Sequence, residues 1–531
     1  MSRPPATKPT LRDISSALAA EEATLRKVSK AATERAHKLN RLTARERIAR
    51  LLDDPNDFFE LGIWAGHKMY SDWGDTPAAG IISGIGHVSG QPCMIAANDA
   101  SVKAGAFFPQ TAKKVIRTQR IAFECNLPIL YLVDSAGVFL PMQDEIFPDE
   151  DDFGRIFRNN AILSAAGVPQ YAAIMGNCVA GGAYLPVLCD KILMTEGSGL
   201  YLAGPSLVKA AIGQEVDSED LGGAKMHAEI SGTVDFREKD DDACIDHLRK
   251  LVDLLPNKPA LVSLVDNTER DPQFLYDIVS PDGSKNYDAR DMLRCIVDGD
   301  SMVESKAEYG QTLITTYAKI GGHAVGIVAN QRMPIRTKKE GIQMAGVIYS
   351  DSADKAARFV MDCNQTGLPI IFFQDVQGFM VGRDAEQTGI IRCGAKLVNA
   401  VSNSVVPKIT VVTGGSFGAG NYALCGRAYD PRFIFAWPNA RYAVMGAAQA
   451  AGTVYSLLKR NSAGSPEEDE QLRERVHRTY QEQTDIRYGA ARGWVDAIIQ
   501  PHETRAVLAK CLDWVSRPMP KARFHSGVMQ T

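Results

Sequence analysis

Two adjacent glycines, Gly181 and Gly182, lie between two apolar runs in IMGNCVAGGAYLPVL, residues 174–188. The residues before them (PQYAAIMG) predict a buried strand, and those after them (AYLPVLCD) carry apolar side chains at helical spacing. A strand that passes through glycine into a helix leaves backbone N–H groups pointing outward at the helix start. Such donors can stabilise an oxyanion from the main chain alone. The alternative is a tight turn that needs glycine only for its dihedral angles, and an isolated glycine pair favours that alternative.

The same pattern recurs in TVVTGGSFGAGNYALC, residues 410–425. The repeat extends upstream, because LPILYLVDSAG begins at Leu127 and LPIIFFQDVQG begins at Leu368, an offset of 368 − 127 = 241. A weaker echo pairs TARERIARLLDD with DARDMLRCIVDGD. A period of this length indicates a duplicated domain and predicts two anion-stabilising turns. Several residue pairs keep the offset: Lys114 and Lys355, Arg117 and Arg358, Pro128 and Pro369, Asp134 and Asp375, and Gly137 and Gly378.

The elements that must position these turns alternate between strand and helix in both halves, which is typical of an α/β fold. Loops at the carboxyl ends of strands are where such sheets bind ligands. A chain of 531 residues is too long for one core. We therefore predict two domains, residues 1–265 and 266–531, joined by a proline-containing linker near residue 260.

Composition excludes several classes of protein. A net charge of −4 argues against a general nucleic-acid binder, and no apolar run reaches membrane-spanning length. The polar N-terminus lacks a signal-peptide core. The ten cysteines never form a CxxC pair, which speaks against a zinc ribbon and a disulfide framework. We expect a cytoplasmic protein with no metal site and with neither a nucleic acid nor a membrane as partner.

Residues 107–126, FFPQTAKKVIRTQRIAFECN, predict a helix that carries Lys113, Lys114 and Arg117 within one turn. Such a trio can bind phosphates, although an isolated basic cluster is more often a solvated helix face.

The acidic segment 139–154 does not have EF-hand spacing and is interpreted as a surface or lid loop. His227 has no triad partners at suitable spacing and is interpreted as structural. The charged stretch 462–483 predicts an exposed helical arm.

Taken together, the motifs resemble the carboxyltransferase β subunit of biotin-dependent acyl-CoA carboxylases, a family of the crotonase superfamily. The resemblance runs from near Asn40 to the C-terminus and is most similar to the branch that acts on methylcrotonyl-CoA or geranyl-CoA. It implies two tandem crotonase-like (ClpP/crotonase superfamily) domains of the ββα-superhelix type. The motifs that carry it are FPDEDDFGRIFRNNA, NCVAGGAY, LAGPSLVKAA with EDLGGA, GFMVGR, and GGSFGAGNYALCGRAYDPRF with WPNAR and VMG.

The resemblance also implies roles for the two turns. The N-terminal domain would hold acyl-CoA, and the amides of Gly181 and Gly182 would stabilise the thioester enolate. The C-terminal domain would hold carboxybiotin, and the amides of Ala419 and Gly420 would stabilise the ureido oxyanion, with Phe417 and Gly418 beside them in the biotin site. Lys113, Lys114 and Arg117 would steer the CoA phosphates.

In this chemistry the biotin anion itself takes the acidic proton of the acyl-CoA, so no side-chain base is required. Both developing charges lie on oxygen, and each preorganised donor is worth roughly 3 kcal/mol of transition-state stabilisation.

The chain contains neither an MKM-type biotinyl-lysine site nor a P-loop. The resemblance therefore implies a separate α subunit, with biotin carboxylase and biotin carrier parts, which uses ATP and bicarbonate. It also implies a hexamer in which two subunits share each active site.

Some positions depart from the family pattern: Ala423 and Leu424 replace glycine and methionine, and Tyr442, Ala447 and Ala448 replace isoleucine, glycine and glutamate. They bear on which acyl-CoA is used. Two alternatives remain at this point, a glutaconyl-CoA decarboxylase-like subunit that runs the transfer in reverse and a non-catalytic crotonase-like scaffold.

Overall fold

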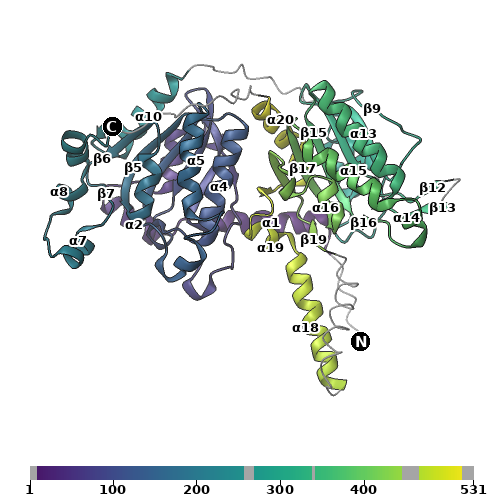
Figure 1. Cartoon of the computed structure of the whole chain (residues 1–531), viewed down its shortest axis with the longest axis horizontal. Helices are drawn as coiled ribbons and strands as arrows, with labels where there is room; N and C mark the ends of the chain where they lie inside the picture. The colour runs from purple at the N-terminus through teal and green to yellow at the C-terminus, as the bar shows by residue number, and fades with distance from the viewer. Residues whose placement is uncertain (1–8, 256–267, 338–340, 445–465, 517–531) are drawn as a thin grey trace. The chain divides into compact units, whose positions relative to one another are not determined.

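The computed structural model describes residues 9–255, 268–337, 341–444 and 466–516 (Figure 1). The described residues fall into two compact units. The N unit lies within Glu22–Leu261, with Ala491–Gly493 and Trp514–Thr531, and the C unit lies within Met1–Glu21, Val262–Ala490 and Trp494–Asp513. The predicted linker near residue 260 and the predicted small-residue helix MGAAQAAG lie outside the described residues.

The N unit is built on one mixed sheet in the order β1-β2-β3-β4-β5-β6-β8, with β7 also pairing with β5. The first three strands are antiparallel and the remaining pairs are parallel. The central strands β3 and β4 are buried along their length and β5 is buried from Gln170 to Gly176, as expected for apolar runs covered on both faces. Their bounds are β1 Phe59–Leu61, β2 Ile81–Val88, β3 Gln91–Asn98, β4 Ile129–Ser135, β5 Gln170–Val179, β6 Lys191–Thr195, β7 Gly199–Tyr201 and β8 Phe236–Glu238.

The C unit repeats this sheet strand for strand, in the order β9-β10-β11-β15-β17-β18-β20, with β19 pairing with β17. The predicted duplication is thus present in the sheet order as well as in the sequence. The bounds are β9 Val303–Glu304, β10 Leu313–Ile320, β11 His323–Asn330, β15 Ile370–Val376, β17 Lys408–Phe417, β18 Phe433–Ala436, β19 Arg441–Ala443 and β20 Ala497–Ile498. Two small ladders join β12 Ile335–Thr337 to β13 Gly341–Gln343 and β14 Val347–Ile348 to β16 Gly378–Phe379.

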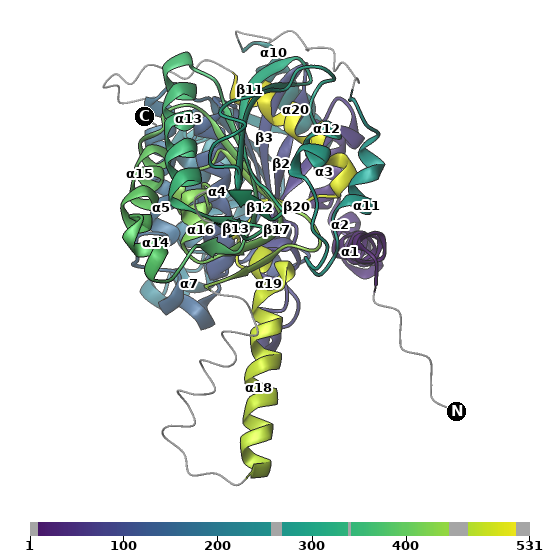
Figure 2. The same ribbon diagram turned by 90° about the vertical axis from the view of Figure 1, so that its right-hand side faces the viewer.

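Helices flank both sheets. In the N unit α4 packs beside α5, and in the C unit α13 packs beside α15 (Figures 1 and 2). The helix predicted from TARERIARLLDD forms as α3, and Thr43 caps it with a capping box to Glu46. The main helices are α1 Leu11–Leu25, α2 Lys30–Lys38, α3 Ala44–Leu51, α4 Pro109–Glu124, α5 Phe153–Ala165, α7 Pro205–Ile212, α10 Asp241–Asp253, α12 Ala289–Arg294, α13 Ser350–Thr366, α15 Ile390–Asn403, α18 Pro466–Thr484, α19 Ile486–Ala491 and α20 Thr504–Val515.

The predicted charged arm is helix α18, which projects from the C unit in both views (Figures 1 and 2). Most of its described side chains are exposed. Among the described residues, no helix combines the length and the apolar character needed to cross a membrane.

Candidate active site

The first glycine turn connects β5 to a single turn of 3-10 helix, Ala180–Ala183, followed by α6 Tyr184–Val187. Ala180 adopts the left-handed region with φ +57°, which is uncommon for a residue with a side chain. The strand therefore turns sharply there, and Gly181 and Gly182 follow at the start of the helical segment. Gly182 is buried, whereas Gly181 is half-buried.

The second turn has the same form. Strand β17 ends at Phe417, Gly418 has φ +55° and helix α16 begins at Ala419 (Ala419–Ala423). The left-handed residue is Ala180 in one turn and Gly418 in the other, so Gly181 corresponds to Ala419 and Gly182 to Gly420. A Cβ at Gly418 would approach the carbonyl oxygen of Val444 to 3.0 Å, which adds a steric reason for glycine there.

The N–H groups of Gly181, Gly182, Ala419 and Gly420 donate to no protein acceptor within the described residues. This is the expected state of the first amides of a helical segment. In contrast, the Gly418 N–H donates to the carbonyl of Ala443 at 3.0 Å, so Gly418 contributes its conformation and not a donor. Phe417 is buried. Each turn therefore offers two unused donors, an arrangement that can stabilise a negatively charged oxygen.

The predicted basic trio lies on α4, but its members differ in environment. Lys113 is exposed and Arg117 is half-buried, whereas Lys114 is buried. The Lys114 ammonium donates to the carbonyls of Ile81 at 2.6 Å and Ala78 at 3.0 Å. The Lys114 charge is therefore enclosed by the main chain of the N unit in this structure, and the role of the trio in steering phosphates stays a prediction.

Burial lowers the pKa of Lys114 to about 7, against the attraction of the Glu60 carboxylate. Glu60 in turn accepts hydrogen bonds from Arg45 on α3. The C unit repeats this arrangement, because Lys355 is buried and Arg290 on α12 binds Glu304 through two hydrogen bonds. The repeated lysine thus belongs to the interior packing of each unit.

Other side chains singled out in the sequence have local roles. The His227 ring contacts the Ser231 hydroxyl and the Leu200 carbonyl, both at 2.9 Å, which agrees with a structural role. In the acidic loop, Asp152 accepts from the N–H of Asp149 at 2.8 Å. No group of three or more metal-ligating side chains occurs among the described residues.

A carboxyl transferase domain profile matches residues 35–524, which is most of the chain. The chain belongs to the carboxyl transferase family. It is 46% identical over 481 residues to the biotin-dependent 3-methylcrotonyl-coenzyme A carboxylase beta1 subunit of Mycobacterium tuberculosis, covering 89% of this chain and 88% of that relative. It is 43% identical over 511 residues to the mitochondrial methylcrotonoyl-CoA carboxylase beta chain of Arabidopsis thaliana, covering 93% and 84%.

Among solved structures, the geranyl-CoA carboxylase β subunit of P. aeruginosa superimposes with a TM-score of 0.86 at 34% identity, covering 100% of this chain and 99% of that chain. These comparisons confirm two predictions. The first is an α/β fold with two crotonase-like halves, and the second is the carboxyltransferase component of a biotin-dependent acyl-CoA carboxylase.

In this carboxyltransferase, the residues that depart from the family pattern differ in burial. Ala423 and Leu424 lie in the hydrophobic core of the C unit, so their effect on a ligand is indirect. Tyr442 lies on β19 beside the second turn, with its ring 5.8 Å from that of Trp494. Ala447 and Ala448 lie outside the described residues.

The sequence reasoning assigned no role to Asp134 and Asp375, although both keep the repeat offset. Each is buried beside the glycine-turn strand of its unit and pairs with a buried arginine, Arg47 and Arg332 respectively. The equal offset of these two aspartates, each at the end of an apolar run, was the signal that the sequence offered.

Proposed function

We propose that this carboxyltransferase moves a carboxyl group from carboxybiotin to the enolate of a branched, α,β-unsaturated acyl-CoA such as methylcrotonyl-CoA. Carboxybiotin, presented by a separate α subunit, supplies the carboxyl group. The amides of Gly181 and Gly182 stabilise the enolate oxygen, and those of Ala419 and Gly420 stabilise the ureido oxygen. Each pair acts where charge develops in the transition state.

The observation that carries this proposal is the matched set of four amides that have no protein acceptor within the described part of the chain. Main-chain donors at the end of a rigid strand need no reorganisation when an oxygen becomes negative. Gly418 and its left-handed φ support close approach of a ligand to the second turn. The proposal assigns no side-chain base, because the resemblance places proton removal on the biotin.

The substrate is tested with a panel of acyl-CoAs. The protein, purified with its α partner and supplied with ATP and labelled bicarbonate, should carboxylate methylcrotonyl-CoA or geranyl-CoA in preference to acetyl-CoA or propionyl-CoA. Incorporation of label into acid-stable product is the measurement. A complex that loads biotin but carboxylates no member of the panel would contradict the proposal, and one that only decarboxylates acyl-CoAs would favour the decarboxylase alternative.

We also propose that Lys113 and Arg117 steer the CoA phosphates, since their side chains remain on the outer part of α4.

Biotin and the α subunit are the implied partners. The Arabidopsis thaliana relative is named as mitochondrial, whereas a cytoplasmic location remains our prediction for this chain.

The oligomer is expected to contain six copies, because the resemblance implies that a second copy completes each active site. Light scattering on the purified protein should give a mass about six times that of the 57.7 kDa chain. A monomer that retains full carboxylation activity would contradict a shared site.

A further inference from the structure

Each glycine-turn strand contains the same irregularity, and it lies opposite a buried aspartate. In the N unit Val133 pairs with Ile174 and Ser135 with Cys178, so a step of two residues on β4 spans a step of four on β5. In the C unit Gln374 pairs with Val412 and Val376 with Ser416, which gives the same count for β15 and β17. A bulge of this kind bends the strand and changes the direction of the residues after it.

The aspartate at the centre of each bulge replaces the missing ladder partner. The Asp134 carboxylate accepts a hydrogen bond from the N–H of Asn177 at 3.2 Å, and the Asp375 carboxylate accepts one from the N–H of Gly415 at 2.8 Å. Without the carboxylate, the N–H groups of Asn177 and Gly415 would lose this acceptor, which is unfavourable for a polar group inside a protein.

The strand itself is shaped to admit the carboxylate. A Cβ at Gly176 would lie 2.0 Å from the Asp134 carboxyl carbon, and a Cβ at Gly414 would lie 2.4 Å from an Asp375 carboxyl oxygen. Both positions therefore require glycine because of the aspartate and not because of their own dihedral angles.

The neighbouring cations come from different parts of the two units. Arg47 on α3 pairs with Asp134 at 3.3 Å, whereas Arg332, which follows β11, pairs with Asp375 at 3.1 Å. Asp375 also accepts from the Tyr287 hydroxyl at 3.2 Å. The two units thus differ in the residues that bind the carboxylate, but in both units the carboxylate lies in the bulge. Its position in the bulge is therefore the feature that the two units share.

We propose that Asp134 and Asp375 are positioning residues that fix the direction of the oxyanion-stabilising amides, each for its own half of the reaction. In both units the paired residue that ends the bulge, Cys178 or Ser416, precedes the second donor of the turn by four residues. A carboxylate that fixes the bulge therefore fixes the path of the chain into the turn. This inference rests on the proposed function of the two turns.

The test compares Asp134→Asn with Asp375→Asn in the complete complex with the α subunit. The side-chain shape is kept, but one acceptor oxygen becomes an NH2 group that opposes the strand N–H. Two rates are measured in the same preparation: release of labelled CO2 from the loaded α subunit without acyl-CoA, and carboxylation of the preferred acyl-CoA. Their ratio does not depend on the fraction of folded protein.

Asp375→Asn should slow CO2 release about 10- to 100-fold, because a displacement of about 1 Å at a reacting group costs that much. Asp134→Asn should leave CO2 release unchanged and lower kcat for carboxylation by a similar factor with KM for acyl-CoA little changed. In the free protein, amide hydrogen exchange should increase in residues 174–188 for the first-unit variant only and in residues 410–425 for the second-unit variant only.

Gly176→Ala and Gly414→Ala displace the same carboxylates without removing their charge and should reproduce the two patterns. Equal loss of CO2 release and carboxylation in Asp134→Asn, or unchanged rates in both aspartate variants, would overturn the inference while the wild-type protein stays active. A wild-type complex that carboxylates no acyl-CoA would overturn the proposed function and this inference with it.

Discussion

Gly182→Pro is expected to lower kcat for acyl-CoA carboxylation by about 100- to 1,000-fold, the typical effect of removing one oxyanion-stabilising donor. Proline has no N–H, and the Gly182 N–H has no protein acceptor within the described part of the chain. Proline is also tolerated in the first turn of a helix, where that N–H has no helical partner. The substitution should therefore remove the donor without removing a hydrogen bond of the fold.

Gly182→Ala is the matched control for the added side-chain volume. A Cβ at this position would lie 3.5 Å from the Gly137 Cα, an ordinary van der Waals contact, so the fold should accept alanine. Carboxylation and loading of biotin by the α subunit are measured for both variants. If Gly182→Pro keeps wild-type carboxylation, the first turn is misassigned; if alanine is as harmful as proline, the effect is steric and not the loss of a donor.

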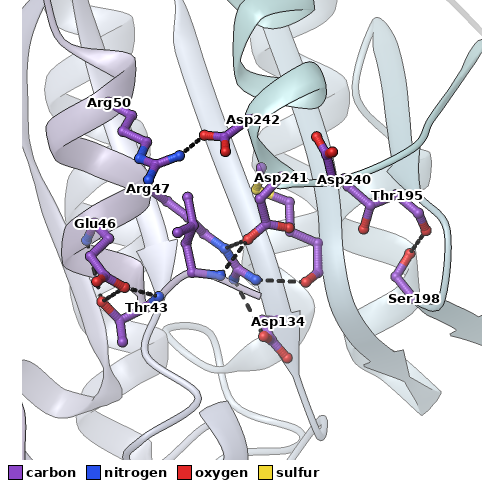
Figure 3. A network of polar contacts seen from close by, with 12 residues as sticks. Thr43, Glu46, Arg47, Arg50, Asp134, Thr195, Ser198, Asp240, Asp241 and Asp242 are labelled. Carbon is purple, nitrogen blue, oxygen red and sulfur yellow. Dashed lines mark hydrogen bonds and ion pairs between the residues drawn. The ribbon is translucent and has the colours of Figure 1, made fainter. Parts of the chain in front are cut away.

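Arg47→Met is expected to destabilise the N unit by about 3–5 kcal/mol, because it leaves buried carboxylates without their cation. Arg47 is 1% exposed. Its guanidinium donates to Asp241 at 2.8 Å and to the Met175 carbonyl at 2.6 Å, and it pairs with Asp134 (Figure 3). For a unit of this size the loss corresponds to a decrease in apparent Tm on the order of 10 °C, measured by thermal unfolding.

The destabilisation caused by Arg47→Met should depend on pH. Burial raises the pKa of Asp134 and Arg47 opposes that increase. A carboxyl group whose folded-state pKa is raised takes up a proton on folding, so its stabilising contribution is lost as pH rises through that pKa. Removing Arg47 raises the pKa of Asp134 further, because the cation that favours the ionised carboxylate is lost. The decrease in Tm of Arg47→Met should therefore be larger at about pH 8 than at about pH 5.5.

Arg50→Met provides the control for Arg47→Met, since it makes the same change one turn further along α3. Arg50 pairs with Asp242, but both side chains are about half exposed (Figure 3). An exposed pair contributes at most about 1 kcal/mol, so Tm should change little. Equal decreases for both variants, or a decrease for Arg47→Met that is independent of pH, would contradict the role assigned to the buried pair.

The sequence alone determined the duplicated α/β architecture and the position of both glycine turns. These features are encoded locally, because apolar runs, glycine spacing and a constant offset between LPILYLVDSAG and LPIIFFQDVQG can be recognised without knowing which segments pack together. The correspondence extends to every strand of the two sheets.

Only the tertiary structure separated Lys113 from Lys114, since adjacent residues of a helix point about 100° apart and the segments that cover each side come from elsewhere in the chain. The acceptors of the Lys114 ammonium are the carbonyls of Ala78 and Ile81, 36 and 33 residues away. The bulges opposite Asp134 and Asp375 likewise exist only as a register between two strands. Burial and strand register depend on contacts between distant segments, which is why residue type and spacing did not decide them.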